Sequence, residues 1–106
     1  MAYEQALNVI KSVTIGATSV LVAGKAPRKV IYLRNTSAAA QVITIAFDNM
    51  NAAVANTGLI IAPGEYVLDS NSEGYSCWNG DIKAIASAAG ATLSVMITPE
   101  DATNGI

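Results

Sequence analysis

The stretch "RKVIYLRNTSAAAQVITIAF" (residues 28–47) decides the fold of this chain. It holds two short apolar runs rich in β-branched residues, and a segment of small and polar residues joins them. Runs of this length, bounded by turn-forming residues, indicate β-strands rather than helices. Ile43, Ile45 and Phe47 occupy alternate positions of the second run. Because alternate side chains of a strand share one face, we expect these three residues to point into the core.

The first of the two runs is apolar on both faces. Ile31 and Leu33 share one face, whereas Val30, Tyr32 and Arg34 share the other. A strand that is apolar on both faces lies inside an assembly or beneath a loop. We therefore expect the face that carries Tyr32 to be covered.

The same pattern continues along the rest of the chain. Leu93, Val95 and Ile97 alternate with other residues near the C-terminus, and Pro63 with Gly64 has the pattern of a type II turn. The strands that we expect span residues 6–14, 18–23, 28–35, 41–47, 58–62, 65–69, 74–78, 81–87 and 91–98.

Strands spaced about 8–12 residues apart, with turns between them, are typical of an antiparallel sandwich or barrel. We predict an all-β fold with a single antiparallel β-sandwich that is jelly-roll-like, since eight strands are usual for a jelly roll. An immunoglobulin-like sandwich is the alternative, because strand order is not visible in the sequence. The single domain spans residues 1–106, and we expect residues 1–5 and 99–106 to be flexible or arm-like. The alanine-rich segment 50–56 is expected to form a loop or one short turn.

The composition narrows the classes of function. The chain has 106 residues, of which 52% are hydrophobic and 13% are charged, against a usual quarter. So few charges suggest that a partner covers part of the surface. The net charge of −2 argues against nucleic-acid binding, which requires a basic surface. No apolar run approaches the roughly 18 residues that span a membrane, and no signal peptide is visible, so we expect synthesis in the cytoplasm.

Side chains suited to catalysis or metal binding are few. The chain contains no histidine and a single cysteine, which excludes Ser-His-Asp and Cys-His catalysis, His-containing zinc sites and an internal disulfide. The stretch "DSNSEG" (69–74) resembles a calcium loop, but polar turn residues explain it equally well. We therefore expect a protein that is not an enzyme and that has no cofactor and no metal.

The stretch "SNSEGYSCWNGDIKAIAS" (70–87) holds the one tryptophan and the one cysteine. The Asn-Gly pair at 79–80 favours a hairpin with a type I′ turn. In that hairpin Cys77 and Tyr75 lie on the core side, and Cys77 is a small buried hydrophobe. Trp78 then lies on the outer, mostly polar face, where it either covers a neighbouring strand or contacts a partner protein or a sugar. A bulge would exchange the two faces.

Four of the six basic side chains fall within one short segment. An acidic chain can use such a segment against an acidic surface of a partner. The alternative, which we prefer, is a solvated loop whose basic residues protect an edge strand from mispairing. The candidate partner-binding residues are Trp78, Lys25, Arg28, Lys29, Tyr32 and Arg34.

Five short motifs follow one another in a recognisable order. They are "RN" (34–35), "AF" (46–47), "PGE" (63–65), "W-x-G-x-I-x-AI" (78–85) and "GATL" (90–93). In this order they resemble the small β-rich capsid decoration, head-fibre and minor structural proteins of tailed bacteriophages. The likeness covers about residues 28–97, and it depends on the order of turns and strands rather than on functional residues.

The resemblance implies a structural role in a virion. The chain would bind the outside of a phage capsid to decorate or stabilise it, with the major capsid protein as its partner. It would form a homo-oligomer, with a trimer favoured, and would lie on the capsid surface after synthesis in the host cytoplasm. The alternative is a carbohydrate- or ligand-binding sandwich that uses the exposed aromatic residues Trp78, Tyr75 and Tyr66 to bind a host glycan. We expect neither nucleic acid nor membrane as a partner.

Overall fold

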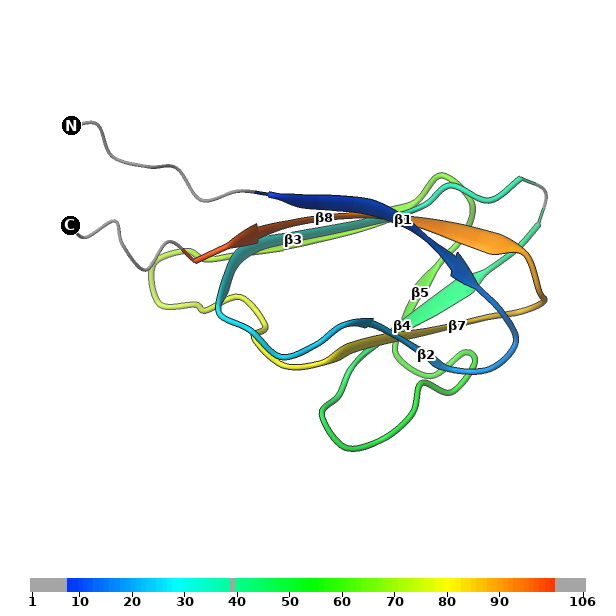
Figure 1. Ribbon diagram of the computed structural model, residues 1–106, viewed down its shortest axis with the longest axis horizontal. Coiled ribbons are helices and arrows are strands. Elements are labelled where there is room, and N and C mark those ends of the chain that lie inside the picture. The colour runs from blue at the N-terminus through cyan, green and yellow to red at the C-terminus, as the bar shows by residue number, and fades with distance from the viewer. Residues whose placement is uncertain (1–7, 39, 101–106) are drawn as a thin grey trace.

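The computed structural model describes residues 8–38 and 40–100, and this part is all-β, with two antiparallel four-stranded sheets packed as a sandwich (Figure 1). Nothing in these ranges is a helix long and apolar enough to cross a membrane. The strands are β1 (Val9–Ile15), β2 (Val20–Ala23), β3 (Arg28–Asn35), β4 (Ile43–Phe47), β5 (Leu59–Ile61), β6 (Tyr66–Ser70), β7 (Ile82–Ala86) and β8 (Ala91–Pro99).

The chain folds like one long hairpin that is wrapped around a core. β4 pairs with β5, β3 with β6, β2 with β7 and β1 with β8, all antiparallel. Further pairing of β3 with β8 and of β4 with β7 joins these strand pairs into two four-stranded sheets. The resulting orders, β1-β8-β3-β6 and β2-β7-β4-β5, are those of a jelly roll. The expected sandwich is therefore confirmed, and its topology is the jelly roll rather than the immunoglobulin-like alternative.

Alternation along the strands builds the core. The expected inward positions of β3, β4 and β8 are all buried except Phe47, which is half-buried and packs against the core cluster. Each sheet supplies one apolar face, and each contributes seven residues to the core cluster. The fully buried large side chains of the core are Ile15, Ile31, Leu33, Ile43, Ile45, Ile82, Leu93 and Val95.

The connection between β5 and β6 forms the expected type II turn. The Glu65 N–H donates to the Ala62 carbonyl oxygen at 2.9 Å, and Gly64 has a φ of 88°. A side chain is disfavoured at this φ, so glycine is the residue that suits the second corner. The turn lies against the end of β3, because the Gly64 N–H donates to the Asn35 carbonyl oxygen at 2.7 Å.

The strand expected at residues 74–78 is absent, and the prediction of a hairpin at Asn79 and Gly80 is wrong. Residues 74–78 form no strand, and neither Asn79 nor Gly80 has the positive φ that a type I′ turn requires. β7 instead pairs with β2 and β4. Tyr75, expected on the core side, is exposed, and an isolated bridge joins it to Ser72. The physical reason is a set of side-chain hydrogen bonds, described below, that holds this segment in place of strand pairing.

The two ends of the domain lie only partly within the described residues. Residues 1–5 fall outside them, as do residues 101–106, so the expectation of flexible or arm-like ends is untested there. Pro99 is the last residue of β8, as expected for a residue without an N–H. The Glu100 N–H still donates to the Pro27 carbonyl oxygen at 3.2 Å. The segment 50–56 is a loop, as expected.

Two isoleucines on neighbouring strands test this assignment of the core. Ile45 of β4 is fully buried, whereas Ile60 of β5 is 49% exposed. We expect Ile45→Ala to lower the free energy of unfolding by about 2–5 kcal/mol, because it leaves a cavity. Ile60→Ala should cost under about 1.5 kcal/mol, because the site already meets solvent. Urea denaturation followed by tryptophan fluorescence measures both values, and equal losses would contradict the assignment.

Candidate interaction surface

Asp69 and Asn71 organise the loop that follows β6. The Asp69 carboxylate accepts one hydrogen bond from the Tyr75 hydroxyl at 2.6 Å and another from the Trp78 N–H at 3.0 Å. The Asn71 side-chain oxygen accepts a hydrogen bond from the Cys77 N–H at 2.7 Å. Asp69 and Asn71, two of the residues in the stretch that resembled a calcium loop, therefore bind main-chain and side-chain donors of their own loop. Within residues 8–38 and 40–100, no group of three or more His, Cys, Asp or Glu side chains gathers as a metal site would need.

Trp78 is built into the protein rather than presented on an outer polar face. Its ring stacks on Phe47 of β4 with a centroid separation of 5.7 Å and an interplanar angle of 6°. Its indole N–H donates to the Asp81 carbonyl oxygen at 2.9 Å. The side chain is half-buried against the core cluster. The predicted outer-face position was wrong, and the ring covers a neighbouring strand, which was the structural alternative.

Arg28 is buried, with 2% of its surface exposed, although it was a candidate for binding a partner. Its guanidinium donates to the carbonyl oxygens of Trp78 at 3.0 Å and Gly80 at 2.8 Å, and also to that of Gly24. Burial lowers the pKa of this guanidinium, while Cys77 and Asp81 raise it. Arg28 thus ties the start of β3 to the loop before β7, and its assignment to an exposed basic segment is corrected.

The other basic candidates are exposed but do not form one patch. Lys29 lies near the start of β3 and Arg34 near its end, about 17 Å away along an extended strand. Lys25 lies before β3, and its N–H donates to the Asp81 carboxylate at 3.0 Å. A compact basic site against an acidic partner is therefore not assembled from these side chains.

Replacing each of two arginines tests the role of Arg28. Arg28→Met keeps a long apolar side chain but removes the donors to buried carbonyl oxygens, so we expect a loss of about 2–3 kcal/mol in the free energy of unfolding. Arg34→Met, at an exposed site on the same strand, should change it by under about 0.5 kcal/mol. Urea denaturation measures both. Equal, small effects would show that Arg28 does not organise the loop.

Cys77 lies in the core, as expected. It is 2% exposed, and its thiol donates to the Asp69 carbonyl oxygen at 3.5 Å. Burial raises the pKa of the thiol to about 11, and the negative charge of Asp69 adds to this effect. Because the thiolate is the reactive form, this environment suits a packed side chain rather than a nucleophile.

The titration of Cys77 predicts how stability depends on pH. Its pKa rises from 9.0 to about 11 on folding, so the folded chain holds the proton more tightly than the unfolded chain. The resulting stability is complete below pH 9 and is lost as the pH rises through 11. The free energy of unfolding should therefore fall more steeply between these pH values for the native chain than for Cys77→Ala. Parallel slopes in urea titrations of the two chains would contradict this.

An apolar row crosses the outer face of the β1-β8-β3-β6 sheet. The strand register places Ile10 opposite Met96, Met96 opposite Tyr32 and Tyr32 opposite Leu68. Ile10 is 70% exposed, Leu68 59% and Met96 37%. Next to this apolar row, the ring of Tyr66 lies 5.4 Å from that of Tyr32. In the single chain this face of β3 is the solvent-facing side of a sheet and no loop of the described residues covers it, so cover within an assembly stays a prediction.

This outer face carries few charges. Among the outward positions that the strand registers pair, Arg34 is the one charged side chain, and the exposed Lys29 lies next to them at the register shift of β3. The sequence revealed the alternation within each strand but not which strands are neighbours, so the apolar row could not be assembled from it. The outward positions are Ile10, Ser12, Thr14, Val30, Tyr32, Arg34, Tyr66, Leu68, Ser70, Thr92, Ser94, Met96 and Thr98.

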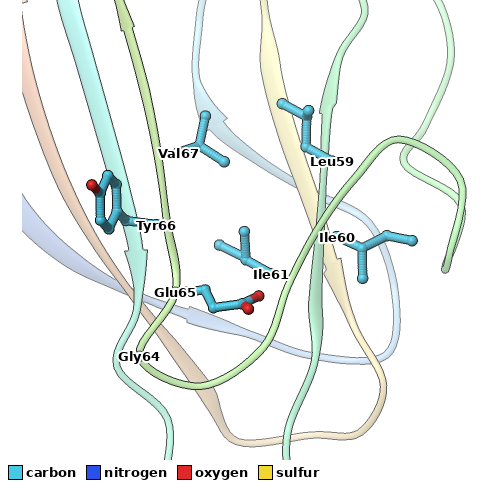
Figure 2. A pocket seen from close by; sticks show the side chains of 7 residues that line it. All are labelled: Leu59, Ile60, Ile61, Gly64, Glu65, Tyr66 and Val67. Carbon is cyan, nitrogen blue, oxygen red and sulfur yellow. The ribbon is translucent and has the colours of Figure 1, made fainter.

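A groove opens where the two sheets meet at β5 and β6 (Figure 2). Ile61 and Val67 point into the space between the two strands, and Tyr66 lies on the opposite side of β6. Leu59 and Ile60 of β5, which also line the groove, are 40% and 49% exposed. The groove therefore lies between the apolar side chains of β5 and the edge strand β6.

Comparison of the chain with models of known protein families, with curated protein sequences and with solved structures finds no match. The features of the chain that bear on its function are therefore the jelly roll, the apolar row and the hydrogen bonds of the polar side chains.

Proposed function

We propose that this chain is a structural virion protein that binds the outside of a phage capsid and decorates or stabilises it without catalysis. The observation that carries the proposal is the apolar row on the outer face of the β1-β8-β3-β6 sheet. Soluble monomers seldom expose a large contiguous apolar patch, and such patches mark sites of interaction. The row spans four strands of a pre-formed sheet, so binding requires little ordering of the chain.

The fold and the polar side chains support the same proposal. Jelly rolls occur among viral capsid proteins and lectins, so the topology agrees with a binding or shell role, although fold alone does not imply function. Asp69 and Arg28 are used in hydrogen bonds of the loop, and Cys77 is packed in the core. These side chains therefore have structural roles that need no substrate.

The physical mechanism is burial of the apolar row against the shell. A specific contact needs about 1,000 Å² or more of buried surface. The outer face of one four-stranded sheet is too small to bury that area with ease. A capsid, however, presents the same binding site many times. If copies of the chain are linked to one another, avidity then strengthens a weak single contact without new interactions. The major capsid protein is the partner that this mechanism requires.

A carbohydrate-binding role is the second candidate, and one observation favours it. Tyr32 lines a shallow hollow together with Arg34, Thr36 and Ser37, and the centroid of the Tyr66 ring lies 5.4 Å from that of Tyr32. An aromatic face next to a guanidinium donor suits a sugar ring. The hydroxyl groups of Thr36 and Ser37 already donate to Thr92 and are therefore acceptors here. Trp78 is less suited, since its indole N–H already has an acceptor and one ring face covers Phe47.

Binding to phage heads tests the proposed function. We expect the purified chain to co-sediment, in saturable fashion, with heads of the phage that encodes it after any bound copies have been stripped off. Met96→Lys, which places a charge in the centre of the apolar row, should reduce this binding at least tenfold. Leu21→Lys, a matched change at a 58% exposed position of the other sheet, should leave it unchanged.

The result that contradicts the proposal is equally direct. A chain that is absent from purified virions and does not bind stripped heads is not a decoration protein. Binding to a glycan array that is lost in Tyr66→Ala would then favour the carbohydrate-binding role.

A further inference from the structure

Three of the four edge strands of the sandwich carry a feature that hinders pairing with another strand. β1 carries Lys11, which points inward and donates from Nζ to the Val22 carbonyl oxygen at 2.8 Å. β2 is interrupted by a register shift between Leu21 and Ala23. β5 has three residues. Inward charges, bulges and short strands are means by which sheets avoid edge-to-edge association.

β6 is the edge that lacks such protection. Its five residues pair with β3 in an uninterrupted register and include no lysine, arginine or proline. Its one charged residue, Asp69, points inward, and both carboxylate oxygens already accept hydrogen bonds from the following loop. Within the part of the chain that the structure describes, β6 is therefore the edge most open to another strand.

The main chain of β6 has N–H and C=O groups along this edge that no residue of 8–38 or 40–100 binds. The Asn71 N–H donates to the Lys29 carbonyl oxygen at 2.9 Å, and the Asn35 N–H donates to that of Glu65 at 3.0 Å. The odd-numbered residues of this pairing thus direct their main-chain groups toward β3. Because these directions alternate along an antiparallel strand, the even-numbered residues direct theirs away from β3. These residues are Tyr66, Leu68 and Ser70.

We propose that β6 pairs antiparallel with β6 of a second copy of this chain, about a two-fold axis at Leu68. The pairing joins two four-stranded sheets into one continuous sheet. In this register Leu68 faces Leu68 of the second copy, and Tyr66 faces Ser70 of the second copy. Each facing pair exchanges both of its main-chain hydrogen bonds, since the outward groups of β6 are the ones that meet. This inference rests on the proposed function, because the β6 pairing would provide the link between copies that avidity on a capsid requires.

A second copy fits this edge because the facing side chains are uncharged. Leucine packs against leucine, and no like charges meet across the two-fold axis. A charged partner strand would find no ion-pair partner at these positions. The apolar row that ends at Leu68 then continues directly into the row of the second copy, which doubles the length of the apolar face. The partner strand also covers the groove that Ile61, Val67 and Leu59 line (Figure 2).

The size of the edge determines how tightly the copies associate. β6 is about 17 Å long, and the two sheets lie about 10 Å apart, so the contact belongs among interfaces of less than about 1,200 Å². Interfaces of this size are weak, and we expect a dimer that depends on concentration. An isologous two-fold contact gives a dimer, which differs from the trimer that the resemblance favours.

Cysteine cross-linking detects this dimer even if it is weak. Facing residues of a hydrogen-bonded pair have Cα atoms about 5.5 Å apart, within the range of a disulfide. Leu68→Cys should therefore form a covalent dimer under mild oxidation, whereas Ile10→Cys, which lies on the same apolar row but on β1, should do so at least tenfold more slowly. Cys77 is buried and should not interfere.

Sedimentation of uncross-linked chains provides the second measurement. The native chain should approach twice the mass of one chain as its concentration rises, and Ile10→Lys should behave alike. Leu68→Pro removes an N–H that points away from β3 and should abolish the dimer while circular dichroism and tryptophan fluorescence remain native. Leu68→Lys should do the same if proline disturbs the fold.

Three results would overturn the inference. They are equal cross-linking of the two cysteine variants, a trimer that Leu68→Lys leaves intact, and a single-chain mass at all concentrations with no Leu68→Cys dimer. None of these results concerns binding to phage heads, so the proposed function can fail or succeed independently.

Discussion

The register between β3 and β8 is the constraint on which the rest of the structure depends. It places Leu33 opposite Val95 inside the sandwich and Tyr32 opposite Met96 outside it. A shift of either strand by one residue would exchange the two faces, exposing the core and burying the apolar row. The same pairing therefore fixes both the stability of the fold and the surface that we propose for binding. The hairpin-like wrapping of the jelly roll then extends this register to β1 on one side and β6 on the other.

Two kinds of interaction stabilise the sandwich. Apolar side chains pack between the two sheets, while polar groups organise the loop between β6 and β7 at one end. Arg28 from the start of β3 and Asp69 from β6 reach the same loop from two directions, and Trp78 lies between them and Phe47. Buried polar groups of this kind are stabilising when their hydrogen bonds are complete, and they specify one loop conformation. The loop is thus part of the fold, and the outer face of the β1-β8-β3-β6 sheet and the β6 edge remain for interaction.

Much of the fold could be predicted from the sequence, because each strand records its own alternation. Ile43 and Ile45, or Leu93 and Val95, are separated by one residue, and no distant information is needed to assign their face. The loop could not be predicted in this way. Its conformation depends on Arg28, which lies about fifty residues away in the chain, and the Asn-Gly pair at 79–80 favoured a hairpin on local grounds. The apolar row was likewise hidden, since its members come from four strands whose order the sequence does not display.

Nuclear magnetic resonance contacts between side-chain protons test the central register most directly. We expect contacts from the Tyr32 ring to Met96 on one side and to Leu68 on the other, with Ile31 and Leu33 protected from a soluble relaxation agent. We also expect this agent to reach Ile10, Met96 and Leu68 in the isolated chain. Contacts from the Tyr32 ring to core residues such as Ile45, together with exposure of Ile31 and Leu33, would show the opposite register and would contradict the account.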